Sequence, residues 1–572
     1  MPVLNAEIAA MFDQTAELLE IDGANPFRVR AYRRAARVID ALPQSVESML
    51  AAGKDLSELP GIGKDLAGKI AEIVRTAKFP LLESLKRKLP GDLVEIAGIP
   101  GLGPKRVKLL FTRARVRTLE DLRRAARSGR LRRLEGFGPK VEQNILAALA
   151  KRVGTEKRTK LSVAEGEADA FVRYLQAGSP RWRVVAAGSF RRRRETVGDL
   201  DFLVTASNAR AVADRFVGYE NVAEVRTHGP ERATVILRSG LQADLRVVHD
   251  ASYGAALLYF TGSKPHNIAL RGVANEHDWK LNEYGLFAGN RRIAGATEED
   301  VYRKLGLDFV PPELREDRGE IDRARARRLP RLITLADIRG DLHTHTKWTD
   351  GNATVAEMAG AAKARGYEYL AVTDHSRKVT VAHGLDPRQL SRQLDEIDRV
   401  NDKLDHFVVL KGIELDILPD GRLDLPDMIL SRLDIVVAAV HSGFDLPREK
   451  QTARVIRAMD SRRVSIIAHP TGRLIGERDP YEIDIERIIE AARERGCHLE
   501  LNAQPDRLDL NEVHARAAKE AGVKLAISSD AHSTATLDWV RFGIDQARRG
   551  WIEPDDVINT RPLAALRKSL KR

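Results

Sequence analysis

The sequence predicts a multidomain protein in which α-helical N-terminal domains precede an α+β region and a C-terminal α/β barrel. Three observations predict this fold class. The chain has 572 residues, more than one hydrophobic core usually supports. A Gly-hydrophobe-Gly pattern recurs three times before residue 150, and beyond residue 336 predicted strands and helices alternate in seven units.

Composition limits the class of protein. Hydrophobic residues make up 43% of the chain, enough for several cores, and we see no apolar run of membrane-spanning length. The N-terminus lacks the charged-then-apolar order of a signal peptide, so we expect a soluble, cytoplasmic protein. The single cysteine, Cys497, excludes an internal disulfide framework, and we expect it to be inert packing.

The net charge of +12 is unevenly distributed. Residues 1–335 hold 58 Lys and Arg against 43 Asp and Glu, whereas residues 336–572 hold 36 against 39. Within residues 101–160 there are 18 basic and 5 acidic residues. This stretch indicates either a surface that binds nucleic-acid phosphates or a solvated basic face, and charge alone does not separate the two.

The three-fold repeat places glycine turns before predicted helices, in LPGIGKDLAGKI (59–70), IPGLGPKRVKLL (99–110) and LEGFGPKVEQNI (134–145). A Gly-x-Gly turn exposes backbone N–H groups at a helix N-terminus, which favours anion binding. The repeats resemble helix-hairpin-helix elements, which grip DNA backbones without reading sequence. The predicted DNA-binding residues are Gly61, Gly63, Lys64, Gly101, Gly103, Lys105, Gly136, Gly138 and Lys140.

From about residue 160, four segments have the period-2 pattern of strands: WRVVAAGSF, GDLDFLVTA, ATVILRSG and LQADLRVVH. Asp199 and Asp201 lie two apart on one predicted strand, so both project from one face. Asp244 lies on a later strand that can run alongside. Three converging aspartates are the minimum for two Mg²⁺ ions in phosphoryl transfer, although an Asp-x-Asp pair alone is more often a turn or an exposed strand.

Upstream of these aspartates, Gly188 and Ser189 lead into the run Arg191–Arg194. Backbone, hydroxyl and guanidinium groups of this kind can bind a triphosphate. Farther on, residues 315–331 are highly charged and lack an apolar face, so we place the main interdomain linker there.

Past residue 336, nearly every predicted strand ends on a metal-type ligand: IRGDLHTH, YLAVTDH, FVVLKGIELD, DIVVAAVH, VSIIAHP, CHLELNA and VKLAISSDAH. Mixed imidazole and carboxylate ligands favour Zn²⁺ or Mn²⁺, and a cluster of two or three ions favours phosphoester hydrolysis. A lone histidine at a strand end is usually structural, but here the pattern repeats along the chain. The nine predicted ligands are His343, His345, Asp350, His375, Glu414, His441, His469, Asp530 and His532.

Residues 1–315 resemble family X of the DNA polymerase beta superfamily, because Gly-Ser, nine further residues, Asp-x-Asp and then LLYFTGSKPHN follow in the order of that family. The resemblance implies Mg²⁺ or Mn²⁺ at a triad of Asp199, Asp201 and Asp244. It implies that Ser189 and Arg192 hold the triphosphate, with Gly188 beside them. It further implies nucleotide contacts at Tyr259, Phe260, Gly262, Asn267 and Arg271.

Two positions depart from that pattern or leave it open. Lys69 falls where the family has a lysine that can form a Schiff base with abasic deoxyribose. The match is poorer nearby, because Asp65 stands where the family has a lysine in the glycine turn, and Arg28 stands at a basic position before the tyrosine. A phosphate-binding role for Lys69 is therefore the alternative. Lys264 stands where polymerase beta has an acidic residue beside the nucleotide. We therefore hypothesise that Lys264 helps to bind dNTP without divalent ions; a solvated lysine is the alternative.

Residues 336–565 resemble the polymerase-and-histidinol-phosphatase (PHP) domain, with all nine ligand positions present. A family X core followed by a PHP domain is the arrangement of bacterial and archaeal DNA polymerases X. The resemblance implies gap filling in base excision repair on gapped or primer-template DNA with dNTPs. It also implies a 3′-5′ exonuclease and an AP-endonuclease or 3′-phosphatase activity. We expect no membrane partner and a monomeric chain.

The predicted domains are a helical N-terminal DNA-binding domain (1–88), a helix-hairpin-helix domain (89–158), a nucleotidyltransferase palm (159–250), a thumb (251–315), a linker (316–335) and a distorted (β/α)7 PHP barrel (336–572). Two rival functions remain. One is a template-independent nucleotidyltransferase fused to a small-molecule phosphatase, and the other is a non-catalytic DNA-binding scaffold.

Overall fold

The computed structural model describes residues 5–570, except 41, 43–45, 60, 77, 90–92, 94–95, 97–98, 100–101, 135, 139–140, 144 and 147–157. The chain divides into two compact units, residues 1–157 and 158–572, and each is treated by itself. Within the described residues, no helix is both long enough and apolar enough to cross a membrane.

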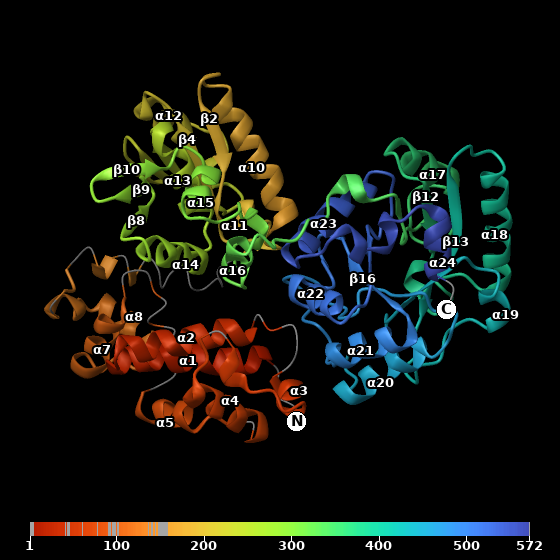
Figure 1. The fold of residues 1–572 in the computed structure, drawn as a ribbon, viewed down its shortest axis with the longest axis horizontal. Helices are drawn as coiled ribbons and strands as arrows, with labels where there is room; N and C mark the ends of the chain where they lie inside the picture. Colours follow the sequence, from red (N-terminus) through yellow and green to blue (C-terminus); the bar gives the residue numbers. More distant parts are fainter. Residues whose placement is uncertain are drawn as a thin grey trace. The chain divides into compact units, whose positions relative to one another are not determined.

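The first unit is helical (Figure 1). One hydrophobic cluster extends from Ile8 to Ile145, so both halves of the predicted N-terminal region share a core. Tyr32 belongs to this core: it is 1% exposed, and its ring lies 5.3 Å from that of Phe12. The helices are α1 (Asn5–Asp22), α2 (Pro26–Asp40), α3 (Val46–Ala51), α4 (Lys64–Thr76), α5 (Pro80–Lys88), α7 (Pro104–Arg113) and α8 (Leu119–Arg127).

The described residues of the three glycine repeats share one backbone hydrogen-bond pattern. In each, the hydrophobe between the glycines is buried, and its N–H donates to the carbonyl three residues earlier: Ile62 to Leu59 at 3.0 Å, Leu102 to Ile99 at 2.8 Å, and Phe137 to Leu134 at 3.1 Å. Gly61 and Gly136 have φ of +84° and +80°, a region that favours glycine. Of the predicted DNA contacts, Gly101 and Lys140 lie outside the described residues, as does the side chain of Lys105.

The second unit begins with a five-stranded sheet of order β2-β4-β7-β6-β5, with α10 and α12 packed against it. Four of these strands match the four predicted segments. The sequence did not indicate β5, because its residues after Val222 are exposed and show no alternation. The elements are β1 (Thr159–Lys160), α10 (Leu161–Gln176), β2 (Arg183–Ala186), α11 (Gly188–Arg191), β3 (Thr196–Val197), β4 (Asp199–Thr205), α12 (Ala209–Val217), β5 (Val222–His228), β6 (Arg232–Leu237) and β7 (Gln242–Val248).

A smaller helical layer with a three-stranded sheet follows, and its core includes Leu258, Leu270 and Tyr302. Its elements are α13 (Tyr253–Thr261), α14 (Lys264–Asn275), β8 (Trp279–Asn282), β9 (Gly285–Ala288), β10 (Arg291–Ala294) and α15 (Glu298–Lys304).

The segment expected to be a linker, 316–335, is instead folded onto this layer. It contains α16 (Glu320–Arg325), whose Ile321 and Ala324 join the same core. Glu320 is fully buried, and its Oε1 lies 2.6 Å from Nδ1 of His266. The pattern was misread because a buried carboxylate that is paired with histidine looks, in sequence, like a solvated charge.

The C-terminal region is a parallel seven-stranded barrel, as predicted (Figure 1). All seven strands occur where they were expected, in the order β11 to β17, and a parallel bridge between Thr344 and Ala531 joins the two ends of the sheet. The strands are β11 (Gly340–Asp341), β12 (Tyr369–Val372), β13 (Val408–Asp416), β14 (Ile435–Ala439), β15 (Ile466–Ile467), β16 (His498–Asn502) and β17 (Leu525–Ser528).

Helices follow the barrel strands and cover them. They are α17 (Val355–Ala364), α18 (Pro387–Asn401), α19 (Asp427–Leu430), α20 (Arg448–Met459), α21 (Ile485–Arg495), α22 (Glu512–Glu520), α23 (Val540–Arg549) and α24 (Leu563–Leu570). Cys497 is buried, as expected for inert packing.

The barrel packs directly against the preceding sheet. Leu508 and Phe542 of the barrel belong to the hydrophobic core of the five-stranded sheet, and Trp551 belongs to that of the smaller layer. Ion pairs flank these contacts, among them Arg473 with Glu195 at 2.6 Å. Residues 158–572 therefore form one unit, not two units joined by a tether.

Candidate functional site

Three carboxylates meet on neighbouring strands of the five-stranded sheet. Strands β4 and β7 are parallel, with Asp201 opposite Asp244 in register, and Asp199 lies two residues before Asp201 on the same face. One carboxylate oxygen from each of Asp199, Asp201 and Asp244 lies within 4.8 Å of the others. The strand register thus brings the predicted triad together at a spacing that fits divalent cations.

The triad carries more negative charge than its surroundings balance. Burial, and then the neighbouring carboxylates Asp199 and Asp244, raise the pKa of Asp201 to about 7. Asp244 is held in place by Thr234 Oγ1 and Gln242 Nε2, which donate to its two oxygens at 2.6 and 2.7 Å. A bound cation would relieve this repulsion, so the residues present fit a metal site.

The Gly-Ser turn closes over the triad. Gly188 has φ of +62°, and a Cβ there would lie 2.2 Å from Oδ2 of Asp201, so only glycine fits. The N–H of Ala187 donates to the Asp201 carbonyl at 2.7 Å. Ser189 follows on the short helix α11 and is half-buried. The turn therefore lies directly beside the carboxylate that the strand register positions.

Three arginines of the run that was expected to bind a triphosphate, Arg191, Arg192 and Arg193, are paired with carboxylates. Arg191 makes two bonds to Glu298, at 2.8 and 2.6 Å. Arg193 pairs with Glu165 and with Asp545 of the barrel, and Arg192 donates through Nε to Glu316 at 3.1 Å. These partners come from distant elements, which the sequence pattern cannot reveal.

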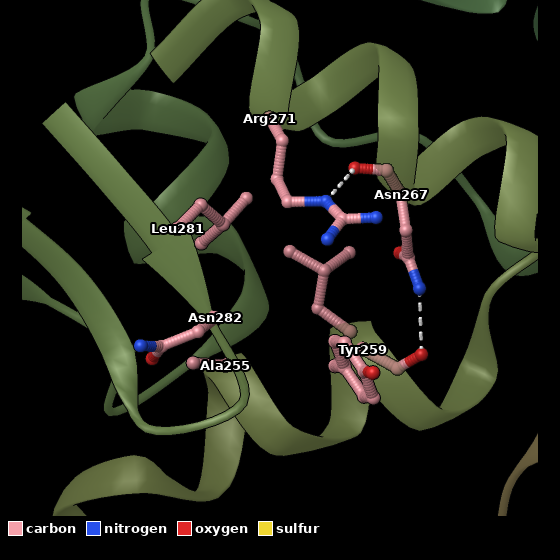
Figure 2. Close-up of a pocket in the computed structure, with 7 residues that line it drawn as sticks. Ala255, Tyr259, Asn267, Arg271, Leu281 and Asn282 are labelled. Atoms are coloured by element: carbon pink, nitrogen blue, oxygen red, sulfur yellow. Dashed lines mark hydrogen bonds between the residues drawn. The ribbon is translucent and has the colours of Figure 1, made fainter. Parts of the chain in front are cut away.

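Three of the predicted nucleotide contacts line one pocket of the smaller layer (Figure 2). Tyr259, Asn267 and Arg271 line it, together with Ala255, Leu258, Leu281 and Asn282. Asn267 Nδ2 donates to the Tyr259 carbonyl at 2.7 Å, and Arg271 Nε donates to the Asn267 carbonyl at 3.2 Å. Tyr259 is 39% exposed, which leaves its ring accessible to a ligand.

Phe260, Gly262 and Lys264, which were also predicted to contact the nucleotide, lie at the end of α13 and the start of α14 and do not line this pocket. The ring of Phe260 meets that of Tyr259 edge-on at 5.2 Å. Gly262 ends α13 with φ of +66°, and a Cβ there would lie 3.2 Å from Nη1 of Arg192. Lys264 is the first residue of α14, and its side chain is exposed.

The nine predicted ligands of the barrel converge at the ends of its strands. Ligand atoms of eight of them fall into three groups, in each of which all atoms lie within 4.8 Å of one another; His469 belongs to none of these groups and adjoins the cluster through Glu414. Glu414 is central: its oxygens lie 2.8 Å from His375, 3.1 Å from His441 and 2.9 Å from His469. The groups are His345, Asp350, His375 and His532; His343, His345 and Asp530; and His375, Glu414 and His441.

Buried polar atoms in this cluster lack hydrogen bonds among the described residues. They include Nε2 of His343, both ring nitrogens of His345, Nδ1 of His375 and Oε2 of Glu414. His375 Nδ1 lies only 2.8 Å from a Glu414 oxygen, yet the geometry is not that of a hydrogen bond. Since leaving buried polar atoms unsatisfied is costly, this donor set fits a cluster of metal ions.

Charges within the cluster shift its titration strongly. Burial opposes protonation of His375, but the carboxylates of Glu414 and Asp350 prevail and raise its pKa to about 10. Burial, and then the neighbouring His375 and His532, lower the pKa of His345 to about 3. His375 is thus protonated beside the carboxylates, whereas His345 is neutral and can offer a lone pair to a cation.

A second layer of side chains orients the ligands, and the sequence analysis did not identify it. Glu500 lies 2.8 Å from His343 Nδ1 and accepts from the N–H of His469 at 2.8 Å. Asn502 Nδ2 donates to Asp530 at 3.0 Å, and Asp416 lies 3.3 Å from His441 Nδ1. The available signal was position: Glu500 and Asn502 lie two apart on β16, the strand to which no ligand had been assigned.

Lys69 does not have the environment of a nucleophile. Its Nζ lies 2.5 Å from Oδ2 of Asp65 and 5.4 Å from the centre of the Tyr32 ring. Burial opposes the charge, but the hydrogen bonds with Asp65 and Tyr32 raise the pKa of Lys69. A lysine held protonated favours the phosphate-binding alternative over Schiff-base chemistry.

Four family models match the chain. The descriptions are "Helix-hairpin-helix domain" over residues 3–79, "SAM-like Helix-hairpin-helix tandem" over 93–151, "DNA polymerase beta thumb" over 256–316 and "PHP domain" over 341–504. These matches confirm the predicted helix-hairpin-helix elements and the predicted PHP barrel.

One of the similar proteins matches the whole chain, and others match only part of it. "DNA polymerase/3'-5' exonuclease PolX" of Bacillus subtilis is 38% identical over 570 residues, 99% of each chain. "DNA polymerase lambda" of Rattus norvegicus is 25% identical over 342 residues, 54% of this chain and 56% of that protein. A "Probable phosphatase" of Thermoanaerobacter sp. is 33% identical over 232 residues, 38% of this chain and 89% of that protein.

Proposed function

The chain belongs to the family X DNA polymerases that carry a C-terminal PHP domain, and from this premise we propose that it fills short DNA gaps in base excision repair and carries a 3′-5′ exonuclease. The five-stranded sheet is then the polymerase palm, the smaller layer the thumb, and the barrel the exonuclease. One observation carries the proposal: each half has its own converging set of metal-type ligands.

In the palm, Asp199, Asp201 and Asp244 are proposed to hold Mg²⁺ or Mn²⁺. Two such ions would activate the primer 3′-hydroxyl and neutralise charge on the triphosphate. Thr234 and Gln242 keep the Asp244 carboxylate turned toward the site, and Gly188 lets the backbone approach it closely. Asp201, with its pKa near 7, loses its proton as the site fills.

Nucleotide selection is assigned to the thumb. Tyr259 and Phe260 present their rings, and Asn267 and Arg271 present polar atoms, beside the pocket of Figure 2. Stacking on Tyr259 and hydrogen bonding to Asn267 would orient a base pair without reading one particular base. Ser189 and Arg192, next to the triad, would contact the triphosphate.

In the barrel, the nine ligands are proposed to hold two or three Zn²⁺ or Mn²⁺ ions. Such ions would supply hydroxide at neutral pH and polarise the scissile phosphate. Glu500 and Asn502 fix the orientation of His343 and Asp530. Because similar proteins include probable phosphatases, we extend the proposal to a 3′-phosphatase activity on DNA and, from the sequence resemblance, to AP-endonuclease activity.

The helix-hairpin-helix turns are proposed to hold the DNA backbone through N–H groups and lysines such as Lys64. Gapped or primer-template DNA and dNTPs are the proposed substrates. A cytoplasmic location and a monomeric chain remain predictions.

Primer extension on one-nucleotide-gapped DNA tests this proposal. Reactions contain Mg²⁺, Mn²⁺ or Zn²⁺, each with and without dNTP. We expect one templated nucleotide to be added when dNTP is present and 3′ shortening when it is absent. Addition that ignores the template base, or an absence of both reactions, contradicts the proposal.

A further inference from the structure

A barrel arginine reaches the polymerase half of the unit. Arg549 is the last residue of α23, and its side chain is 1% exposed. Its Nη2 donates to Oε1 of Glu512, on the neighbouring barrel helix, at 2.9 Å. Its Nη1 donates to Oε1 of Glu316, at the end of the thumb, at 3.0 Å. A buried arginine between two carboxylates holds a fixed orientation.

Glu316 also contacts two arginines of the palm, Arg192 and Arg194. The same Oε1 accepts from Nε of Arg192 at 3.1 Å, and Oε2 lies 3.6 Å from Arg194. Burial alone would favour the neutral acid, but Arg549, then Arg192, lower the pKa of Glu316 to about 2, so it stays ionised at neutral pH. Arg192 Nη1 in turn donates to the Thr261 carbonyl at 2.5 Å, next to Gly262.

Arg549 also holds the main chain of the Gly-Ser turn. Its Nη1 donates to the carbonyl of Arg192 at 2.8 Å. Arg192 is the C-cap of α11, the short helix that begins at Gly188 against Asp201. One barrel side chain thus contacts both ends of the arginine that leads out of this turn: its carbonyl directly, and its guanidinium through Glu316.

The charged side chains around Glu316 and Arg549 include more arginines than carboxylates. Among the described residues, four guanidinium groups, those of Arg192, Arg194, Arg318 and Arg549, form ion pairs with two carboxylates, Glu316 and Glu512. Among the residues that the structure describes, no hydrogen bond engages Nη2 of Arg192. A triphosphate beside the triad is an anion of the charge and size that this excess suits.

We propose that Arg549, a residue of the exonuclease barrel, is a positioning residue for dNTP binding at the polymerase site. It fixes the turn from Gly188 to Arg192 and, through Glu316, aims the Arg192 guanidinium so that Nη2 faces the triphosphate. This inference rests on the polymerase function proposed above.

Steady-state gap filling by the full chain tests the inference. For Arg549→Met we expect KM for dNTP to rise about tenfold, as for loss of a charge-assisted contact, while kcat changes by less than about twofold. The Kd for gapped DNA and the exonuclease rate stay as in wild type. Arg549→Lys keeps the positive charge but loses the planar guanidinium with its several N–H donors. Its KM for dNTP should therefore lie between those of wild type and Arg549→Met.

Arg548→Met is the matched control. Arg548 lies on the same helix and also crosses the interface, but it donates to Glu313 at 2.8 Å and to the Ile333 carbonyl at 3.1 Å. We expect its KM to stay within about twofold of wild type. An equal rise in both variants means that any disturbance of the interface suffices, and overturns the inference.

Glu316→Gln decides the case if Arg549→Met does not fold, which loss of its thermal transition and of its exonuclease activity would reveal. If Glu316 aims Arg192, KM rises; if Glu316 instead competes with the triphosphate, KM falls and the inference is rejected. A wild-type enzyme without templated incorporation refutes the proposed function itself. Wild-type incorporation with an unchanged KM in folded Arg549→Met refutes only this inference.

Discussion

The two metal-ligand sets of this chain are built in different ways. The palm triad consists only of carboxylates, from two adjacent strands, and all three are half-buried. The barrel cluster combines six imidazoles with three carboxylates from the ends of strands around the barrel, and most of them are buried. Register alone forms the first set, whereas the second needs the whole barrel to close.

This difference has a chemical consequence. Three carboxylates cannot complete the octahedral shells of two Mg²⁺ ions, so water or oxygens of the nucleotide and primer must complete them. Nine ligands with a supporting layer of hydrogen bonds can hold ions without any substrate. We therefore expect the palm to bind metal together with its substrate and the barrel to bind metal before it.

The largest effect should follow from removing a triad aspartate. Asp199→Ala or Asp244→Ala should lower nucleotide incorporation by roughly 10⁴-fold, because only two of the three carboxylates that would hold the ions remain. Exonuclease activity and DNA affinity should stay unchanged. Primer-extension and nuclease gels on the same preparations measure this, and incorporation that persists would refute the assignment of the triad.

Removing one barrel ligand should have a smaller effect. His343→Ala or Asp530→Ala should slow the exonuclease by about 10²-fold, since eight ligands remain, and should leave incorporation intact. The same gels measure both rates. Loss of both activities together would indicate a shared site or a misfolded variant, and a melting curve separates these.

Metal removal should distinguish the sites by stability. Stripping with a chelator should lower the melting temperature of the barrel by about 5 to 10 °C, because bound ions stabilise only the folded state. Asp199→Ala should show the same drop as wild type. His343→Ala should show a smaller one, and an equal drop in that variant would locate the stabilising ions elsewhere.

Metal binding by the palm should depend on pH because of Asp201. With its pKa near 7, Asp201 carries a proton below that pH, and a cation must displace it. The Mn²⁺ affinity of the palm, measured as the binding that Asp199→Ala removes, should therefore rise about tenfold per pH unit up to about pH 7 and level off above about 8. Calorimetric titration measures it, and an affinity that is constant between pH 6 and 8 would contradict the prediction.

The smallest effect concerns Lys264, exposed at the start of α14. Its ammonium should contribute to dNTP binding in the absence of metal, so that Lys264→Ala weakens binding in EDTA by about fivefold, within the range of a screened charge pair. With Mg²⁺ present the loss should be smaller. Equal affinities of wild type and variant in EDTA would show a lysine that points into solvent.

The sequence predicted the elements whose ligands fall at strand ends. His375, Glu414 and His441 were found because a hydrophobic strand followed by a ligand is a local pattern. Asp199 and Asp201 were predicted because they lie two apart on one predicted strand, which is also a local pattern. Asp244, on a later strand, was predicted from its strand pattern and from the family X order of motifs.

What the sequence left hidden depends on distant partners. The run Arg191–Arg194 was expected to bind a triphosphate, but Arg191 forms an ion pair with Glu298 and Arg193 forms one with Asp545. Both carboxylates lie far along the chain. Segment 316–335 looked like a linker because Glu320 and its partner His266 are separated by 54 positions. Glu500 carried no pattern of its own, since a buried carboxylate that supports a histidine resembles any strand residue.

The folded segment 316–335 bears on how such enzymes can be recombined. A chimaera that joins this polymerase half to a barrel from a relative, with the crossover near residue 335, would separate Glu316 from Arg549 and Arg193 from Asp545. In such a hybrid, Glu316 and Arg193 would be left without the barrel residues with which they form ion pairs. The boundary between residues 157 and 158 is the better crossover point, because the two compact units meet there in sequence. Exchange of DNA-binding heads should therefore be tolerated more readily than exchange of nucleases.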